Sequence, residues 1–167
     1  TEGQVEALRE VALGEGRTAL EAQRLAAVGT AMQGYVDAAR QSMQEVMAEA
    51  PNDGAVLATA GILASEQDDW IAATEYLKAA VASGTGFDSE ALTHLGILLV
   101  SRGEFAEAKD YLSRAMALDE TNTRARLFHA ICQREQGLYD EAIRQLDSVA
   151  KTSGPLAPQA AVEMGRA

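Results

Sequence analysis

The stretch Arg102-Gly103-Glu104-Phe105-Ala106-Glu107-Ala108 decides the fold, because its pattern recurs along the chain at intervals of 34 or 35 residues. A turn residue is followed by a large apolar residue and then by an alanine at helical spacing. The other copies are Gly34-Tyr35-Val36 with Ala39, Asp68-Asp69-Trp70 with Ala73, and Gly137-Leu138-Tyr139 with Ala142. Four copies in register predict a stack of helix–turn–helix repeats, because each repeat can bury its apolar face only against a neighbour.

Small residues stand where the two helices of each repeat should approach most closely. They are Ala27, Gly61, Gly96 and Ala130 in the first helices, and Ala39, Ala73, Ala108 and Ala142 in the second helices. A large residue in place of Ala108 should overpack its site, at a cost of about 1–3 kcal/mol. We further expect a large side chain to fill the gap beside each turn: Tyr35 or Val36, Trp70, Phe105 and Tyr139.

The apolar spacing also predicts where the helices begin and end. First helices are expected near 18–32, 54–66, 89–102 and 123–136, and second helices near 35–49, 69–82, 104–118 and 138–152. Residues 2–13 also follow a helical pattern. The expected N-caps are Asp53, Asp88 or Ser89, and Thr121 or Asn122, because short polar side chains accept bonds from the first free amides of a helix. Ser83-Gly84-Thr85-Gly86 is interpreted as a helix C-cap and loop, since glycine commonly ends helices.

The repeat resembles the tetratricopeptide repeat family over roughly Leu20 to Ser153. The resemblance implies an all-α fold, an α-solenoid of antiparallel helix pairs wound into a right-handed superhelix. Within one domain of 1–167, the repeats would be 20–53, 54–88, 89–122 and 123–156. Residues 1–19 would be a helix of a partial preceding repeat or an N-terminal cap. Residues 157–167 would be a C-terminal capping helix or the start of a further repeat.

The charge of the chain limits its partners. The net charge is −11, and the pI is about 4.6. We therefore expect no binding to nucleic acid or to anionic membranes, because both need clustered Lys and Arg. No segment approaches the roughly 20 consecutive apolar residues of a spanning helix, so we expect a soluble protein without direct membrane insertion. The choice between cytoplasm and periplasm stays open.

No catalytic or metal-binding constellation is evident, so we expect neither an enzyme nor a cofactor. His94 and His129 occupy nearly equivalent places in successive first helices, with Cys132 three residues beyond His129. Two histidines and one thiol make an incomplete metal shell. Cys132 is better interpreted as a small core residue than as a nucleophile, because a reactive thiol needs a basic, partly exposed setting.

The resemblance implies that the first helices line a concave groove where ligands lie. The residue after each close-packing small residue would point into this groove, and all four such residues are β-branched and apolar. The expected partner-binding residues are Arg24, Val28, Ala58, Ile62, Ser65, Thr93, Ile97, Val100, Leu127, Ile131 and Arg134. The asparagines and lysines with which some family members grip a terminal carboxylate are missing here, so that binding mode is not expected.

The sequence therefore predicts a scaffold or adaptor that binds a peptide or amphipathic helix of another protein in an apolar groove. An alternative is an architectural repeat domain of a larger multidomain protein, or a homo-oligomer formed through the solenoid ends. A chaperone for secreted or membrane proteins is a third possibility. The groove could also be covered by the protein's own chain.

Overall fold

The computed structural model describes residues 7–9, 18–84, 88–152 and 154–167. The described part of the chain contains helices and turns and no strand. Of the helix predicted over 2–13, residues 7–9 are described and are helical, and the remainder lies outside the described residues. Residues 85 and 86 of the predicted loop also lie outside them.

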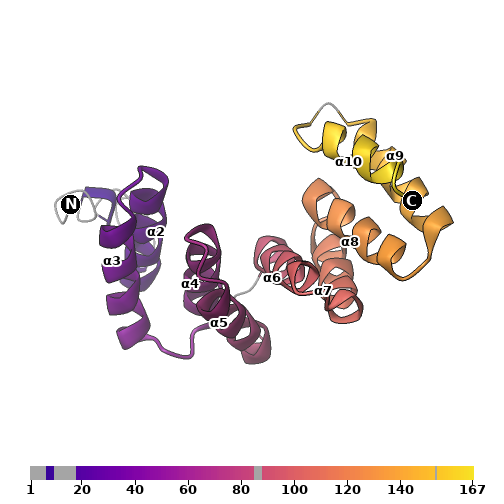
Figure 1. The fold of residues 1–167 in the computed structure, drawn as a ribbon. Helices are drawn as coiled ribbons and strands as arrows, with labels where there is room; N and C mark the ends of the chain where they lie inside the picture. Colours follow the sequence, from indigo (N-terminus) through magenta and orange to yellow (C-terminus); the bar gives the residue numbers. More distant parts are fainter. Residues whose placement is uncertain (1–6, 10–17, 85–87, 153) are drawn as a thin grey trace. The chain divides into compact units, whose positions relative to one another are not determined.

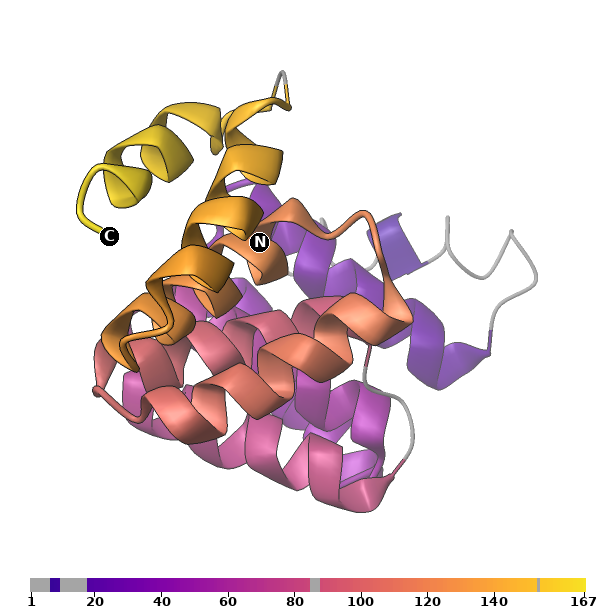
Figure 2. The ribbon, with the colours of Figure 1, turned by 90° about the vertical axis from the view of Figure 1, so that its right-hand side faces the viewer.

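The helices alternate between first and second members of antiparallel pairs (Figures 1 and 2). The first helices are α2 (Ala19–Met32), α4 (Gly54–Glu66), α6 (Ser89–Ser101) and α8 (Thr123–Glu135). The second helices are α3 (Val36–Glu49), α5 (Trp70–Ser83), α7 (Phe105–Leu118) and α9 (Tyr139–Ala150), and α10 (Ala157–Met164) follows them. Every predicted boundary between 18 and 152 is within two residues of the observed one, which confirms the all-α fold of paired helices.

The first helices begin at side-chain caps. Thr18, Asp53, Asp88 and Asn122 each accept a hydrogen bond from the backbone amide three residues later. The predicted caps Asp53, Asp88 and Asn122 are thus confirmed. Of the second helices, α5 alone has such a cap, from Asp69, whereas Tyr35, Glu104 and Leu138 make no side-chain cap bond.

The turn within each pair follows one backbone pattern. Gly103 has a φ of +77°, in the left-handed region that favours glycine, and Glu104 N then donates to Leu99 O at 2.9 Å. Asp68 occupies the same place in the second repeat with a φ of +59°. Aspartate is one of the few other residues that tolerate this region, which explains why the turn survives without glycine. Gly84 likewise ends α5 in the left-handed conformation, as predicted.

The small residues stand at the closest helix approaches, as predicted. A Cβ atom on Gly61 would lie 2.5 Å from Leu77 Cγ, and one on Gly96 would lie 2.5 Å from Leu112 Cγ. Real Cβ atoms do not approach other atoms so closely. The alanines at equivalent places are fully buried: Ala27, Ala39, Ala73, Ala108, Ala130 and Ala142.

The prediction that a large side chain fills the gap beside each turn is wrong for most positions. Trp70 is 50% exposed and Tyr139 is 51% exposed, and Tyr35 and Val36 are also exposed. Phe105 alone is partly buried. These residues stand at the start of each second helix, at the edge of the repeat, where only a short turn lies beside them. The alanines three or four residues later are fully buried, as was predicted for them separately.

The chain divides into two compact units, Thr1–Phe87 and Asp88–Ala167. The first contains α2 to α5, and one of its buried clusters joins Ala27, Met43, Val46, Val56, Ala60 and Leu63. The second contains α6 to α10, and its corresponding cluster joins Leu127, Ala130, Ile131, Leu146, Val149 and Ala160. Each unit therefore buries apolar side chains from successive repeats, as a helical repeat requires. Within the described residues, no helix is both long enough and apolar enough to cross a membrane.

Candidate functional site

We call the face formed by the predicted partner-binding residues of the first helices the first-helix face. In the first unit it comes from α2 and α4, where Val28 and Ile62 are partly buried. Ala58 and Ser65 are buried, and Ser65 Oγ donates to Ile62 O at 2.8 Å. Arg24 Nη1 donates to Thr59 Oγ1 at 2.8 Å and so ties α2 to α4. The apolar side chains that keep accessible surface here are those of Val28 and Ile62.

In the second unit the first-helix face comes from α6 and α8. Ile97 and Val100 are partly buried. Thr93, one helical turn before Ile97, is 2% exposed. Leu127, one helical turn before Ile131, is 0% exposed. Ile131 is 8% exposed. In this unit, therefore, Ile97 and Val100 are the apolar residues of the face that a partner could reach, and Leu127 belongs to the core.

The C-terminal helix α10 covers the end of this face. Ile131 belongs to the same buried cluster as Ala160 of α10, and Val100 packs against that cluster. Arg134 forms ion pairs with Glu135 and with Glu163 of α10, and the side chains of Arg134 and Glu163 are only 15% and 10% exposed. Part of the predicted binding surface is thus covered by the protein's own chain.

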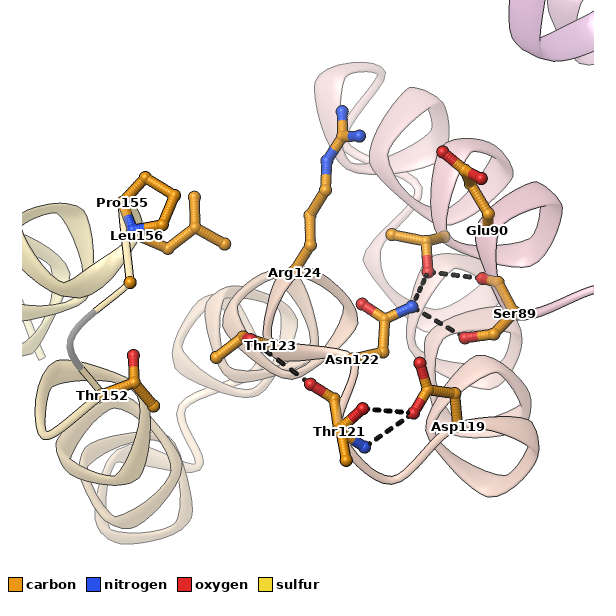
Figure 3. Close-up of a pocket in the computed structure, with 12 residues that line it drawn as sticks. Ser89, Glu90, Asp119, Thr121, Asn122, Thr123, Arg124, Thr152, Pro155 and Leu156 are labelled. Carbon is orange, nitrogen blue, oxygen red and sulfur yellow. Dashed lines mark hydrogen bonds between the residues drawn. The ribbon is translucent and has the colours of Figure 1, made fainter.

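A polar pocket of about 410 Å³ opens at the N-terminal ends of α6 and α8, beside the segment that leads into α10 (Figure 3). Thr93, a predicted partner-binding residue, is one of its walls. Ser89 and Arg124 stand one helical turn before Thr93 and Leu127, so the pocket lies at the end of the first-helix face. Its described lining residues are Ser89, Glu90, Thr93, Asp119, Thr121, Asn122, Thr123, Arg124, Thr152, Gly154, Pro155 and Leu156.

Asn122 organises one wall of the pocket. Its Oδ1 accepts from Ala125 N at 2.8 Å and caps α8. Its Nδ2 donates to Ser89 Oγ at 2.7 Å and to Thr93 Oγ1 at 3.0 Å, both on α6. Thr93 Oγ1 in turn donates to Ser89 O at 2.6 Å. One amide therefore fixes the N-terminal ends of two successive first helices; the dashed lines in Figure 3 show its bonds to α6.

Arg124 and His94 meet beside this wall. Arg124 Nη1 lies 3.3 Å from His94 Nε2. Burial is the main cause that lowers the pKa of His94 to about 4; the positive charge of Arg124 adds to the effect, and Asp88 opposes it to a smaller extent. The imidazole is therefore neutral at pH 7, and in the tautomer that carries its proton on Nδ1, Nε2 accepts the bond from the guanidinium.

The other residues with potential chemistry lie in the core. His129 Nδ1 is 3.0 Å from Gln145 Oε1. Burial lowers the pKa of the His129 imidazole. Cys132 is fully buried, and burial raises the pKa of its thiol to about 11. A protonated, enclosed thiol is a poor nucleophile, which confirms its interpretation as a core residue. Among the described residues, no group of three or more His, Cys, Asp or Glu side chains could hold a metal ion.

Sequence reasoning placed Ser89 and Asn122 as possible helix caps and missed the pocket that they border. The run Asp119-Glu120-Thr121-Asn122-Thr123 carries the signal, because it crowds hydroxyl and amide groups at one helix start. The contributions of Thr152, Pro155 and Leu156 depend on how α10 folds back, and that was not visible in the repeat pattern.

Comparison with known proteins agrees with this architecture. Two sequence models described as tetratricopeptide repeat match the chain, over residues 58–123 and 99–161. In the comparison with curated proteins, no sequence matched.

Several solved structures are similar. YrrB, described as a TPR protein with an unusual peptide-binding site, superposes with a TM-score of 0.78 at 20% identity, over 97% of this chain and 82% of that chain. Yeast Tom70 gives a TM-score of 0.71 at 18% identity, over 88% of this chain and 32% of that chain. The Arabidopsis OM64 TPR domain gives 0.59 at 17% identity, over 68% and 94%. At these identities the likeness shows the fold.

Proposed function

Because this chain belongs to the tetratricopeptide repeat family, whose helical repeats form a protein-interaction scaffold, we propose that it binds a peptide or amphipathic helix of a partner on its first-helix face. The observation that carries the proposal is the recurrence of a partly accessible, β-branched residue at one helix position. Val28, Ile62 and Ile97 occupy that position in three successive first helices. The peptide-binding site ascribed to YrrB, which shares the fold, supports the same mode of action.

The size of the apolar contribution fits a moderate affinity. Each fully buried Val or Ile side chain contributes roughly 1.5–3 kcal/mol. The proposed contact residues are already partly buried, so each has less to gain than this. Association also costs several kcal/mol in lost freedom of motion. We therefore expect that further hydrogen bonds are needed. Exposed oxygen atoms of the pocket, such as those of Glu90 and Thr121, can accept them from main-chain amides of a bound segment.

The proposed role is non-catalytic. Proteins of this family are generally interaction modules without catalysis. The neutral, buried side chains of His94, His129 and Cys132 are consistent with such a role here.

The test is quantitative affinity capture from the source cells with the wild-type protein and with Ile62→Asp and Ile97→Asp. A charge on the first-helix face should remove the captured partner, because an unpaired carboxylate cannot be buried without a large cost. Ile143→Asp is the matched control, since Ile143 is exposed on α9, away from this face. Circular dichroism checks that each variant stays folded.

Capture of the same partner by all the variants would overturn the proposal. Binding should also change little between low and physiological salt, since an apolar contact is not screened. A steep loss of the partner with salt would instead indicate recognition by charge.

A further inference from the structure

A second surface lies on the other side of the helix pairs in the first unit. A cleft of about 140 Å³ opens between the second helices α3 and α5, above α4 (Figure 1 labels the three helices). Met43, Met47, Leu63 and Tyr76 give it an apolar interior. We call it the α3–α5 cleft, and its lining residues are Arg40, Met43, Gln44, Met47, Ala60, Leu63, Ala64, Gln67, Asp69, Ala72 and Tyr76.

The volume of the α3–α5 cleft corresponds to one large apolar side chain. A cavity of about 150 Å³ lined by apolar residues accepts a benzene ring. Two of the lining residues are methionines, whose flexible side chains adapt to differently shaped partners. The cleft is therefore suited to a Phe, Leu or Met side chain inserted from outside.

Exposed apolar side chains stand at the two turns of the first unit, close in sequence to the lining residues Arg40, Asp69 and Ala72 of the cleft. Met32 is 83% exposed, Ile71 is 76% exposed, and Tyr35, Val36 and Trp70 are also exposed. The N-terminal part of α3 is joined to the turn after α4, because Arg40 donates to Gln67 Oε1 from Nη2 at 2.6 Å and from Nε at 3.1 Å. Large exposed apolar residues close to an apolar cleft are consistent with an interaction site.

The charge around the cleft is negative. Residues 32–40 and 66–72 carry four carboxylates, those of Asp37, Glu66, Asp68 and Asp69, and one cation, Arg40, for a net charge of −3. Within the described part of the chain, Asp37 is the only one of the four in an ion pair, with Arg40 at 4.0 Å. The remaining carboxylates face solvent and attract cations. The aromatic faces of Trp70 and Tyr35 would also favour a guanidinium or ammonium group.

We propose that the α3–α5 cleft binds a basic amphipathic segment of a partner protein. One apolar side chain of the segment fills the cleft, and its Lys and Arg side chains lie against Asp37, Asp68 and Asp69. This surface is separate from the first-helix face, so the scaffold engages two segments at once.

The probe is a synthetic amphipathic helix with Leu and Phe on one side and Lys on the other, labelled for fluorescence anisotropy. A second peptide carries Glu in place of Lys, and a third carries Ala in place of Phe. The Lys peptide should bind, and both matched peptides should bind at least about tenfold more weakly, because the first loses the charge complement and the second loses the anchor.

Protein variants locate the binding site. Ala72→Phe fills the cleft from its rim and should weaken binding by about tenfold or more, whereas Ala106→Phe, the same change at an exposed place on α7, should not. Asp37→Asn, Asp68→Asn and Asp69→Asn together remove three charges, while Asn keeps the cap at 69 and tolerates the positive φ at 68. Glu104→Gln, Asp140→Asn and Glu141→Gln remove the same charge from the second unit as a control.

Nuclear magnetic resonance of the wild-type protein gives a readout that does not depend on the folding of any variant. Addition of the Lys peptide should shift the amide resonances near Met43, Met47 and Tyr76. Absence of binding to the Lys peptide, or equal binding of the Glu peptide, would overturn the proposal. So would binding that survives Ala72→Phe but is lost in Ile62→Asp, because the peptide would then occupy the first-helix face. If the first-helix face proves not to bind a partner, these results at the cleft stand unchanged.

Discussion

At the scale of single residues, the close packing of the third repeat depends on Gly96, which has no Cβ atom. Gly96 faces Leu112 so closely that a Cβ atom would lie 2.5 Å from Leu112 Cγ and 2.7 Å from its Cδ2. Leu112 is itself fully buried and cannot swing into solvent. Protein interiors are close-packed, so the helices α6 and α7 must separate if the space is filled.

We predict that Gly96→Ala lowers the free energy of unfolding by about 1–3 kcal/mol, because the cost of overpacking exceeds the gain in helix propensity. Urea unfolding followed by circular dichroism measures the change. Gly165→Ala is the matched control: its Cβ would meet Val162 O at an ordinary 3.5 Å, so stability should not fall. A Gly96→Ala variant as stable as the wild type would show that the helix pair yields easily.

At the candidate site, the sequence pattern predicted the accessibility of some residues and not of others. Val28, Ile62 and Ile97 remain accessible, as their place after a small residue suggested, but Ile131 occupies the equivalent position and is buried. The difference comes from α10, whose Ala160 shares a cluster with Ile131. Sequence spacing gives the direction of a side chain on its own helix, and cannot say whether a later segment folds over it.

At the scale of helices, first and second members of each pair begin differently. The first helices have side-chain caps, whereas α3, α7 and α9 have none. The capping residues were predictable, because a short polar side chain before an apolar run has few other roles. The exposure of Trp70 and Tyr139 was not predictable in the same way, since an aromatic residue after a turn is equally compatible with burial.

We predict that Asp88→Ala destabilises the protein by about 1 kcal/mol, because Ala91 N loses the acceptor that it bonds at 2.9 Å. Asp88→Asn should restore most of the loss, as the amide oxygen can accept the same bond. Thermal unfolding of the three proteins at one pH measures the effect. If Asp88→Asn is as unstable as Asp88→Ala, the charge at the helix start matters more than the cap.

At the scale of the whole molecule, the chain divides after Phe87 into two units with cores of their own. The division falls next to the predicted boundary between repeats 54–88 and 89–122. Helical repeats gain stability mainly from their nearest neighbours, so a unit with two complete pairs and α10 has the contacts that it needs.

We predict that residues 88–167 fold in isolation, with helical circular dichroism and a cooperative urea transition. Dispersed amide resonances for Leu95, Leu127 and Leu146, which are all fully buried, would confirm native packing. A fragment that is helical but unfolds without cooperativity would show that this unit depends on residues 1–87.

The hydrogen bonds of Asn122 all fall within one repeat length. The side chain reaches back to Ser89 and Thr93 and forward to the amide of Ala125, whose counterpart 34 residues earlier is Ala91. A synthetic tandem array made by copying residues 89–122 end to end would therefore inherit every one of these bonds at each junction. Copying the segment would therefore preserve the hydrogen bonds that link successive first helices.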